Sequence, residues 1–210
     1  MKSELVFWNV DTQRDFMNTN GALYVADADL IKPNLQQITQ YAHQNKIKIM
    51  GSVDAHKEKD AELSANGGPF PQHCMVGSFG QKHIEETFPE NAVYVPNMKL
   101  VNGKLDEFVM HGGEVFMEKQ HYDVFTNPNT EELLRKLGVK TAVVYGVATD
   151  YCDRAAALGF RKMGIDVFLV EDAIKAVTEQ GGKDALKEMH RAGVKKITTA
   201  DVLAGAFYQK

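Results

Sequence analysis

The chain has 210 residues and a formal net charge of −4 at pH 7, which is most simply one domain spanning residues 1–210. Its acidic balance offers no basic surface for nucleic acid, and no apolar run approaches the length that crosses a membrane. Only two cysteines are present and no signal-peptide pattern precedes the first apolar run, so we expect free thiols and a cytoplasmic protein.

Short apolar runs alternate with helical patterns along the chain. The runs that we expect to form buried strands are 5–10, 46–53, 115–117, 141–147, 166–170 and 194–198. Between the first two, apolar residues from 31 to 42 recur at helical spacing, with Asp29 as a candidate N-cap and Pro33 in the first turn. Further helices are expected over 127–138, 153–163 and 182–192, with Gly138 and Gly193 at the ends of the first and last.

This alternation predicts an α/β fold, because strands separated by helices join through right-handed crossovers into a parallel sheet. We expect three layers: a doubly wound, mostly parallel six-stranded sheet with helices on both faces. The stretch from about 54 to 113 breaks the alternation, since it is rich in glycine and proline and has no strong period. A long irregular excursion in a compact domain is usually functional.

Reactive side chains follow four of the predicted strands. Asp11 follows the first strand, Asp54 and His56 the second, Lys119 the third and Cys152 the fourth. The carboxyl ends of parallel strands meet at one edge of a sheet, where such folds bind their ligands. We therefore expect these side chains to converge on one pocket.

Cys152 is the candidate nucleophile of that pocket. A lone cysteine is more often a small buried hydrophobe, and Asp11 or Lys119 alone is explained by a loop or a solvated strand end. Together they form a set in which the carboxylate takes the thiol proton and the ammonium holds both charges. We also expect the first turn of the helix to lower the thiol pKa of Cys152.

A second group suits a metal ion. Asp54 and His56 lie two residues apart, His73 follows in the excursion, and Glu62 is a carboxylate between them. Imidazoles and carboxylates bind Zn²⁺, Fe²⁺ or Mn²⁺, although two histidines in a polar loop are more often surface residues. Three aromatic residues flank these candidates and offer a slot for a planar ring: Phe16, Phe70 and Tyr151.

The sequence resembles the isochorismatase-like cysteine hydrolase superfamily, and most closely its nicotinamidase/pyrazinamidase branch. Five segments carry the resemblance over nearly the whole chain: 10–16 (VDTQRDF), 54–56 (DAH), 70–74 (FPQHC), 118–119 (EK) and 146–152 (GVATDYC). Arg14 stands where an asparagine is common, Phe70 replaces a frequent tryptophan, and Tyr151 stands where histidine is one common choice.

The resemblance implies roles for these positions. It implies that Cys152 is the nucleophile, Asp11 the acid and base, and Lys119 the third member of a triad. It implies a cis peptide bond at Val147–Ala148 and an oxyanion hole formed by the backbone N–H groups of Ala148 and Cys152. The implied metal ligands are Asp54, His56, His73 and Glu62, with Asp60 and Glu58 as competitors for the fourth place. The implied substrate contacts are Phe16, Phe70, Val147 and Tyr151.

The implied activity is metal-assisted hydrolysis of nicotinamide to nicotinate and ammonia through a thioester on Cys152. The expected cofactor is one divalent ion, zinc first, with iron or manganese as alternatives. Rival functions are an amidase for a carbamoyl or ureido substrate and a non-catalytic metal- or ligand-binding protein. The expected partner is a small-molecule amide, with no nucleic acid and no membrane. A homo-oligomer stays open, with Phe207 and Tyr208 as a candidate contact, and Cys74 is expected to be structural.

Overall fold

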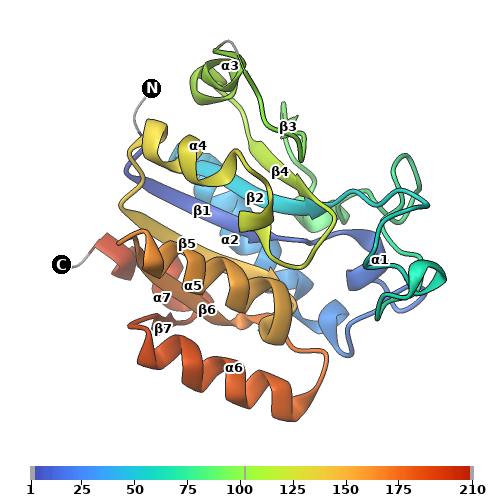
Figure 1. Ribbon diagram of the computed structural model, residues 1–210. Helices are drawn as coiled ribbons and strands as arrows, with labels where there is room; N and C mark the ends of the chain where they lie inside the picture. Colours follow the sequence, from blue (N-terminus) through green and yellow to red (C-terminus); the bar gives the residue numbers. More distant parts are fainter. Residues whose placement is uncertain (1–2, 102, 209–210) are drawn as a thin grey trace.

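A single parallel sheet organises the molecule (Figure 1), of which the computed structural model describes residues 3–101 and 103–208. The strand order is β3-β4-β2-β1-β5-β6-β7, and every pair of neighbours is parallel. The strands are β1 (Leu5–Val10), β2 (Lys48–Asp54), β3 (Val93–Val95), β4 (Val115–Lys119), β5 (Thr141–Val147), β6 (Asp166–Lys175) and β7 (Lys195–Ile197). Because β2 and β5 flank β1 on opposite sides, the switch in strand order lies at the carboxyl end of β1.

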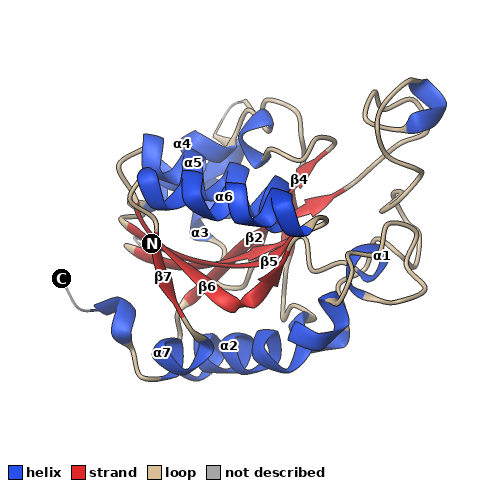
Figure 2. Cartoon of the chain, turned by 90° about the horizontal axis from the view of Figure 1, so that it is seen from below, coloured by secondary structure: helices blue, strands red, loops and turns tan. Residues whose placement is uncertain are grey.

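Helices cover both faces of this sheet (Figure 2). One face carries α4 (Thr130–Leu137), α5 (Arg154–Lys162) and α6 (Glu179–Arg191), and the other carries α2 (Lys32–Gln44) and α7 (Thr199–Leu203). The shorter α3 (Lys104–Met110) packs beside α4, and α1 (Arg14–Met17) follows the end of β1. Among the described residues, no helix combines the length and apolar character needed to cross a membrane.

The core consists of two apolar layers, one on each side of the sheet. On β1, Val6, Trp8 and Val10 belong to the layer under α4, α5 and α6, whereas Phe7 belongs to the layer under α2 and α7. Successive side chains of a strand point to opposite faces, so a strand covered on both sides reads as a continuous apolar run. This explains why the central strands were visible in the sequence.

The predicted fold class is confirmed, but the expectation of six strands is wrong. The additional strand, β3, has three residues and lies inside the irregular stretch 54–113. It is held by pairing with a distant strand, in register from Val93↔Val115 to Val95↔Met117. Three residues are too few to show a period, so this strand depends on tertiary pairing that the local sequence does not reveal.

The predicted helix boundaries are partly wrong. Asp29 does not cap α2; its Oδ1 accepts a hydrogen bond from the Tyr24 hydroxyl, and a 3₁₀ turn (Ala28–Ile31) leads into the helix. Pro33 lies in the first turn of α2, and Gly138 ends α4 with a φ of 75°, as predicted. The helix expected over 153–163 begins with a π-helical turn (Thr149–Asp153) before α5.

The C-terminal aromatic pair is divided between core and surface. Phe207 is buried and packs edge-on against Phe7, with ring centroids 5.3 Å apart. Tyr208 is 62% exposed. The contact that explains Phe207 is therefore within the chain, and a subunit contact at Tyr208 stays a prediction.

Candidate active site and metal centre

The predicted reactive residues come together at the carboxyl edge of the sheet. Asp11 follows β1, Asp54 ends β2, Lys119 ends β4, and Cys152 lies in the π-helical turn after β5. The strand registers place Asp54 opposite Lys119, and Val10 opposite Gly146. The four positions lie on four adjacent strands at the switch in strand order.

Lys119 connects the acidic residues to the thiol. Its Nζ lies 2.8 Å from Asp11 Oδ2 and 3.7 Å from Cys152 Sγ, and it forms a second ion pair with Asp54 Oδ1. The other oxygen of Asp11, Oδ1, accepts a hydrogen bond of 2.8 Å from the Ser52 hydroxyl. Both Lys119 and Asp11 are inaccessible to solvent, so these charges interact in a medium of low polarity.

The electrostatics of this set differ from the prediction for Cys152. Burial raises the pKa of the Cys152 thiol well above its ordinary value, although Lys119 opposes the shift. The expected lowering at a helix start is wrong in this resting state, because the loss of hydration outweighs it. Burial also raises the pKa of Asp11, against the effect of Lys119, which makes this carboxylate a better acceptor for the thiol proton.

Lys119 itself stays an ammonium. Burial alone would lower its pKa, but the negative charges of Asp11 and Asp54 raise the pKa well above the usual lysine value. A buried ammonium is therefore the fixed positive charge around which the two carboxylates and the thiol are arranged.

Four residues form a buried cluster beside this set. The potential ligand atoms of Asp54, His56, Glu62 and His73 all lie within 4.8 Å of one another. His73 Nε2 is 3.3 Å from Asp54 Oδ2, and His56 Nε2 is 3.5 Å from Glu62 Oε2. Among the described residues, His56 Nε2 is buried without a hydrogen-bond partner, although carboxylate oxygens of Glu62 and Asp54 lie within ion-pair distance of it. Two imidazoles and two carboxylates in this arrangement fit one divalent metal ion.

Groups behind the cluster orient its members. His56 Nδ1 lies 3.3 Å from Asp60 Oδ2, His73 Nδ1 lies 2.7 Å from the Pro71 carbonyl oxygen, and Glu62 Oε1 accepts from the Tyr122 N–H at 3.1 Å. Such contacts fix the orientation of the imidazole or carboxylate that would face a metal ion. Of the three acidic candidates for the fourth place, Glu62 lies within the cluster, and Asp60 lies behind His56.

The field inside the cluster is strongly negative. Burial opposes protonation of His56, yet the carboxylates of Asp54 and Glu62 raise the pKa of its imidazole to about 9. Burial would raise the pKa of Asp54, but Lys119 and the two imidazoles hold it well below its usual range. A position that attracts a proton this strongly also attracts a cation.

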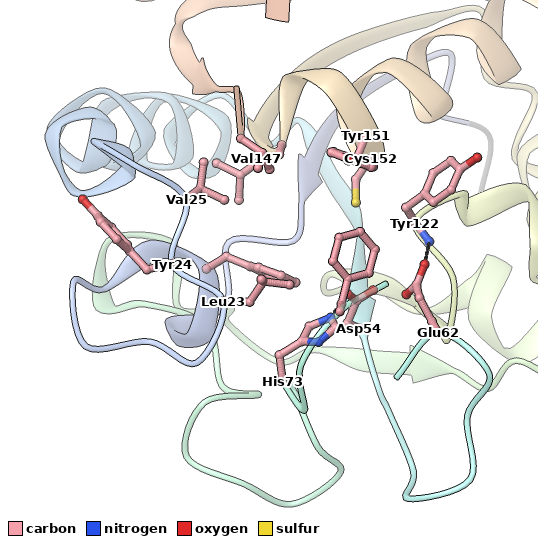
Figure 3. A pocket seen from close by; sticks show the side chains of 14 residues that line it. Leu23, Tyr24, Val25, Asp54, Glu62, His73, Tyr122, Val147, Tyr151 and Cys152 are labelled. Carbon is pink, nitrogen blue, oxygen red and sulfur yellow. Dashed lines mark hydrogen bonds and ion pairs between the residues drawn. The ribbon is translucent and has the colours of Figure 1, made fainter. Parts of the chain in front are cut away.

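The two groups open into one cleft (Figure 3), which encloses about 520 Å³ of empty space including its mouth. The sulfur of Cys152 faces this cavity from one side, and Asp54, Glu62 and His73 lie on another. The predicted contacts Phe16, Phe70, Val147 and Tyr151 all line it, together with Leu23, Tyr24, Val25, Tyr122, Ala148 and Val177. Sequence reasoning missed the segment 23–25, Tyr122 and Val177, which are ordinary apolar residues until the fold gathers them.

The turn that carries Cys152 has an unusual backbone. The Val147–Ala148 peptide bond is cis, as the resemblance implies. Gly146 has a φ of 131°, and a Cβ there would lie 2.0 Å from the Val10 carbonyl oxygen, so only glycine fits between β5 and β1. Ala148 and Cys152 both line the cleft, and their role as an oxyanion hole stays a prediction.

Comparisons with known proteins agree with this arrangement. A family model described as the isochorismatase domain matches residues 5–201. A nicotinamidase of Acinetobacter baylyi is 28% identical over 207 residues, which covers 92% of each chain. A nicotinamidase of Escherichia coli is 26% identical over 204 residues, which covers 91% of this chain and 93% of that protein.

Among solved structures, a pyrazinamidase of Pyrococcus horikoshii in complex with zinc is 29% identical, with a TM-score of 0.76. The match covers 93% of this chain and 99% of that chain. The fold and the site thus define a three-layer α/β protein with a parallel sheet and a buried cluster of potential metal ligands. The chain belongs to the isochorismatase family.

Proposed function

We propose that this protein is a metal-assisted cysteine amidohydrolase of the nicotinamidase type, which converts nicotinamide and water to nicotinate and ammonia. The observation that supports this most is that Cys152 and the Asp54–His73 cluster open into the same apolar cleft. We also treat the whole chain, 1–210, as one hydrolase domain in which the excursion 54–113 provides all four proposed metal ligands.

The first half of the reaction forms a thioester. Asp11 takes the proton of the Cys152 thiol, and the thiolate attacks the carboxamide carbon, so that the carbonyl oxygen becomes an oxyanion. The backbone N–H groups of Ala148 and Cys152 donate to that oxyanion. As the intermediate collapses, Asp11 gives its proton to the departing nitrogen and ammonia leaves.

The second half releases the acid. Asp11 takes a proton from water, whose oxygen attacks the thioester carbon. The carbon–sulfur bond breaks, the carboxylic acid leaves, and Asp11 returns the proton to the sulfur of Cys152. Throughout, the Lys119 ammonium offsets the negative charge that moves between Asp11 and Cys152.

The divalent ion would be held by Asp54, His56, Glu62 and His73. When bound, it supplies a Lewis acid beside the substrate, which suits the ring nitrogen of nicotinamide or a water molecule. Zinc is the ion that we propose, with iron and manganese as alternatives, because the set mixes imidazole and carboxylate donors. The zinc complex of the Pyrococcus horikoshii relative supports this choice.

The lining of the cleft argues against the carbamoyl and ureido rivals that carry a carboxylate. The residues that line it include no lysine or arginine, and they include five phenylalanine and tyrosine side chains: Phe16, Tyr24, Phe70, Tyr122 and Tyr151. Apart from the metal ion and His73, the lining offers a bound carboxylate no positive partner. A neutral aromatic amide such as nicotinamide meets stacking surfaces instead.

Replacement of Cys152 tests the proposal directly. We expect the parent protein to release ammonia from nicotinamide in the presence of zinc, and Cys152→Ala to lose more than about 10³-fold of this rate because no thioester forms. Zinc binding should persist in the variant, since Cys152 is outside the ligand cluster.

Cys74→Ala is the matched control, because this second thiol is buried away from the cleft lining. Undiminished ammonia release by Cys152→Ala would refute the mechanism. A parent protein that prefers ureido or carbamoyl acids to nicotinamide would refute the substrate.

A further inference from the structure

Asp54 belongs to both halves of the candidate site. Its Oδ1 is ion-paired with Lys119, and its Oδ2 faces His73 Nε2 at 3.3 Å and His56 Nε2 at 3.7 Å. A small rotation of this one residue would therefore disturb the nucleophile set and the metal cluster together. Its position depends on the backbone at the very end of β2.

On the side of β1, the backbone of Asp54 lies beyond the last residue that pairs with β2. Along β2 the backbone groups point alternately to β1 and to β4: the Ser52 carbonyl accepts from Asp11 N–H at 3.1 Å, whereas Ala55 N–H donates to the Lys119 carbonyl at 2.9 Å. Asp54 therefore faces the β1 side, two residues after the last paired position, Val10↔Ser52. There β1 has already turned away, since Asp11 adopts a left-handed φ of 46°.

The side chain of Gln13 lies where β1 would otherwise continue beside Asp54. Its Oε1 accepts from Asp54 N–H at 2.7 Å, and its Nε2 donates to the Asp54 carbonyl at 2.8 Å. A third bond of 2.8 Å joins Nε2 to the Gln81 carbonyl. Gln13 is completely buried, so these bonds do not compete with water. The amide takes the place of the missing strand and satisfies both backbone groups of Asp54.

We propose that Gln13 is a positioning residue that holds Asp54 between Lys119 and the two histidines, and so couples the nucleophile to the metal cluster. The inference rests on the proposed function, and it assigns a role to a residue of the segment 10–16 that the mechanism does not use. Gln13 acts on the site through Asp54, and it is not among the residues that line the cleft. Loss of such a support for a metal ligand typically weakens metal binding by roughly 10–100-fold.

If Gln13 only stabilised the fold, its replacement would not weaken metal binding specifically. A second buried amide in the chain provides a control for this alternative. Asn129 is also buried, and its side-chain amide likewise forms three hydrogen bonds to backbone groups. Its Nδ2 donates to the carbonyls of Pro96 and Met98, at 3.2 and 2.8 Å, and its Oδ1 accepts from Leu100 N–H at 3.0 Å. None of these residues lines the cleft.

The experiment compares Gln13→Leu with Asn129→Leu. Zinc affinity is measured by competition with a chromophoric chelator, and the unfolding midpoint of each metal-free protein is measured in parallel. We expect Gln13→Leu to weaken zinc binding by roughly 10–100-fold. We expect Asn129→Leu to lower the unfolding midpoint as Gln13→Leu does, while zinc affinity stays within about twofold of the parent, because Asn129 makes no hydrogen bond to a residue of the metal cluster.

Gln13→Glu provides a second variant if Gln13→Leu does not fold. It keeps an acceptor for the Asp54 N–H but places an oxygen against the carbonyls of Asp54 and Gln81, so it too should weaken zinc binding. A folded Gln13 variant with parental zinc affinity, equal weakening in Asn129→Leu, or a parent protein without a zinc site would overturn the inference. Zinc binding that depends on Gln13 in a protein inactive on nicotinamide would refute only the proposed function.

Discussion

His83 is a buried histidine outside the candidate site, and it makes the stability of the protein depend on pH. Its ring is 2% exposed and packs against Phe116, with centroids 4.5 Å apart, while its Nδ1 lies 3.4 Å from the Thr12 hydroxyl. Burial lowers the pKa of His83 to about 4. This loss of hydration is the cause of the shift, so the imidazole is neutral in the folded protein near pH 7.

The consequence is a loss of stability in mild acid. Between about pH 6.5 and 4, the unfolded chain protonates this histidine and the folded protein does not, so the free energy of unfolding falls as the pH falls. The loss approaches about 3 kcal/mol at pH 4, at 1.36 kcal/mol for each unit by which the pKa is lowered.

We expect His83→Gln to flatten this dependence, because the replacement does not titrate. Urea unfolding at a series of pH values from 4.5 to 7 measures it, with His190→Gln on the exposed end of α6 as the control. An unchanged slope in His83→Gln would show that other groups cause the acid sensitivity.

At the scale of elements, Asp150 connects the turn that contains Cys152 to the start of α6. Its Oδ1 accepts from Val177 N–H at 2.8 Å, and its Oδ2 accepts from Thr178 N–H at 3.1 Å. Thr178 in turn caps α6 by accepting from Gly181 N–H. Because Val177 and Cys152 both line the cleft, this carboxylate sets one cleft wall relative to the sulfur.

We expect Asp150→Asn to lower the free energy of unfolding by about 1–3 kcal/mol, since an amide cannot accept both N–H groups and loses the favourable charge at the helix start. We also expect slower alkylation of Cys152, measured by mass spectrometry after iodoacetamide treatment. Asp172→Asn is the comparison, because Asp172 Oδ1 likewise accepts from the N–H and hydroxyl of Thr199 at the start of α7. Equal effects of both variants on the thiol would contradict a local role for Asp150.

Strands and helices with a clear pattern in their own sequence were predictable, whereas elements that depend on contacts with distant segments were not. The strands 5–10 and 141–147 are apolar because both faces are covered, and polar residues at their ends mark the edge where the site forms. In contrast, β3 exists only through its pairing with β4, and Asp29 resembles a cap although its carboxylate binds Tyr24. The thiol pKa of Cys152 was misjudged because burial cannot be read from sequence position alone.

For the candidate site, the reactive residues were predictable but their supports were not. Strand order brings Asp11, Lys119 and Cys152 together, and this follows from the alternation of strands and helices. The amide of Gln13 and the apolar wall at 23–25 have no chemical signature, and they acquire a role only when distant segments meet.

At the scale of the whole molecule, a bound ion should stabilise the fold, because the four cluster atoms come together only in the folded protein. A ligand at 100 times its dissociation constant adds about 2.7 kcal/mol to the free energy of unfolding. For a domain of this size, that corresponds to a rise of about 5–10 °C in the unfolding midpoint.

We therefore expect added zinc to raise the midpoint of the chelated protein in a thermal scan, and His73→Gln to reduce the response. His73 contributes one of the cluster atoms but lies outside the nucleophile set. A response that is equal in the parent and in His73→Gln would place the zinc elsewhere on the protein.

The shared position of Asp54 also fixes the charge of the site. Asp11, Asp54 and Glu62 carry three negative charges, and Lys119 carries one positive charge, which leaves a formal deficit of two. One divalent ion makes this buried interior electrically neutral, whereas a monovalent or trivalent ion does not. With both imidazoles neutral, as metal ligands are, this charge balance would favour a divalent ion under the proposed function, whether that ion is zinc, iron or manganese.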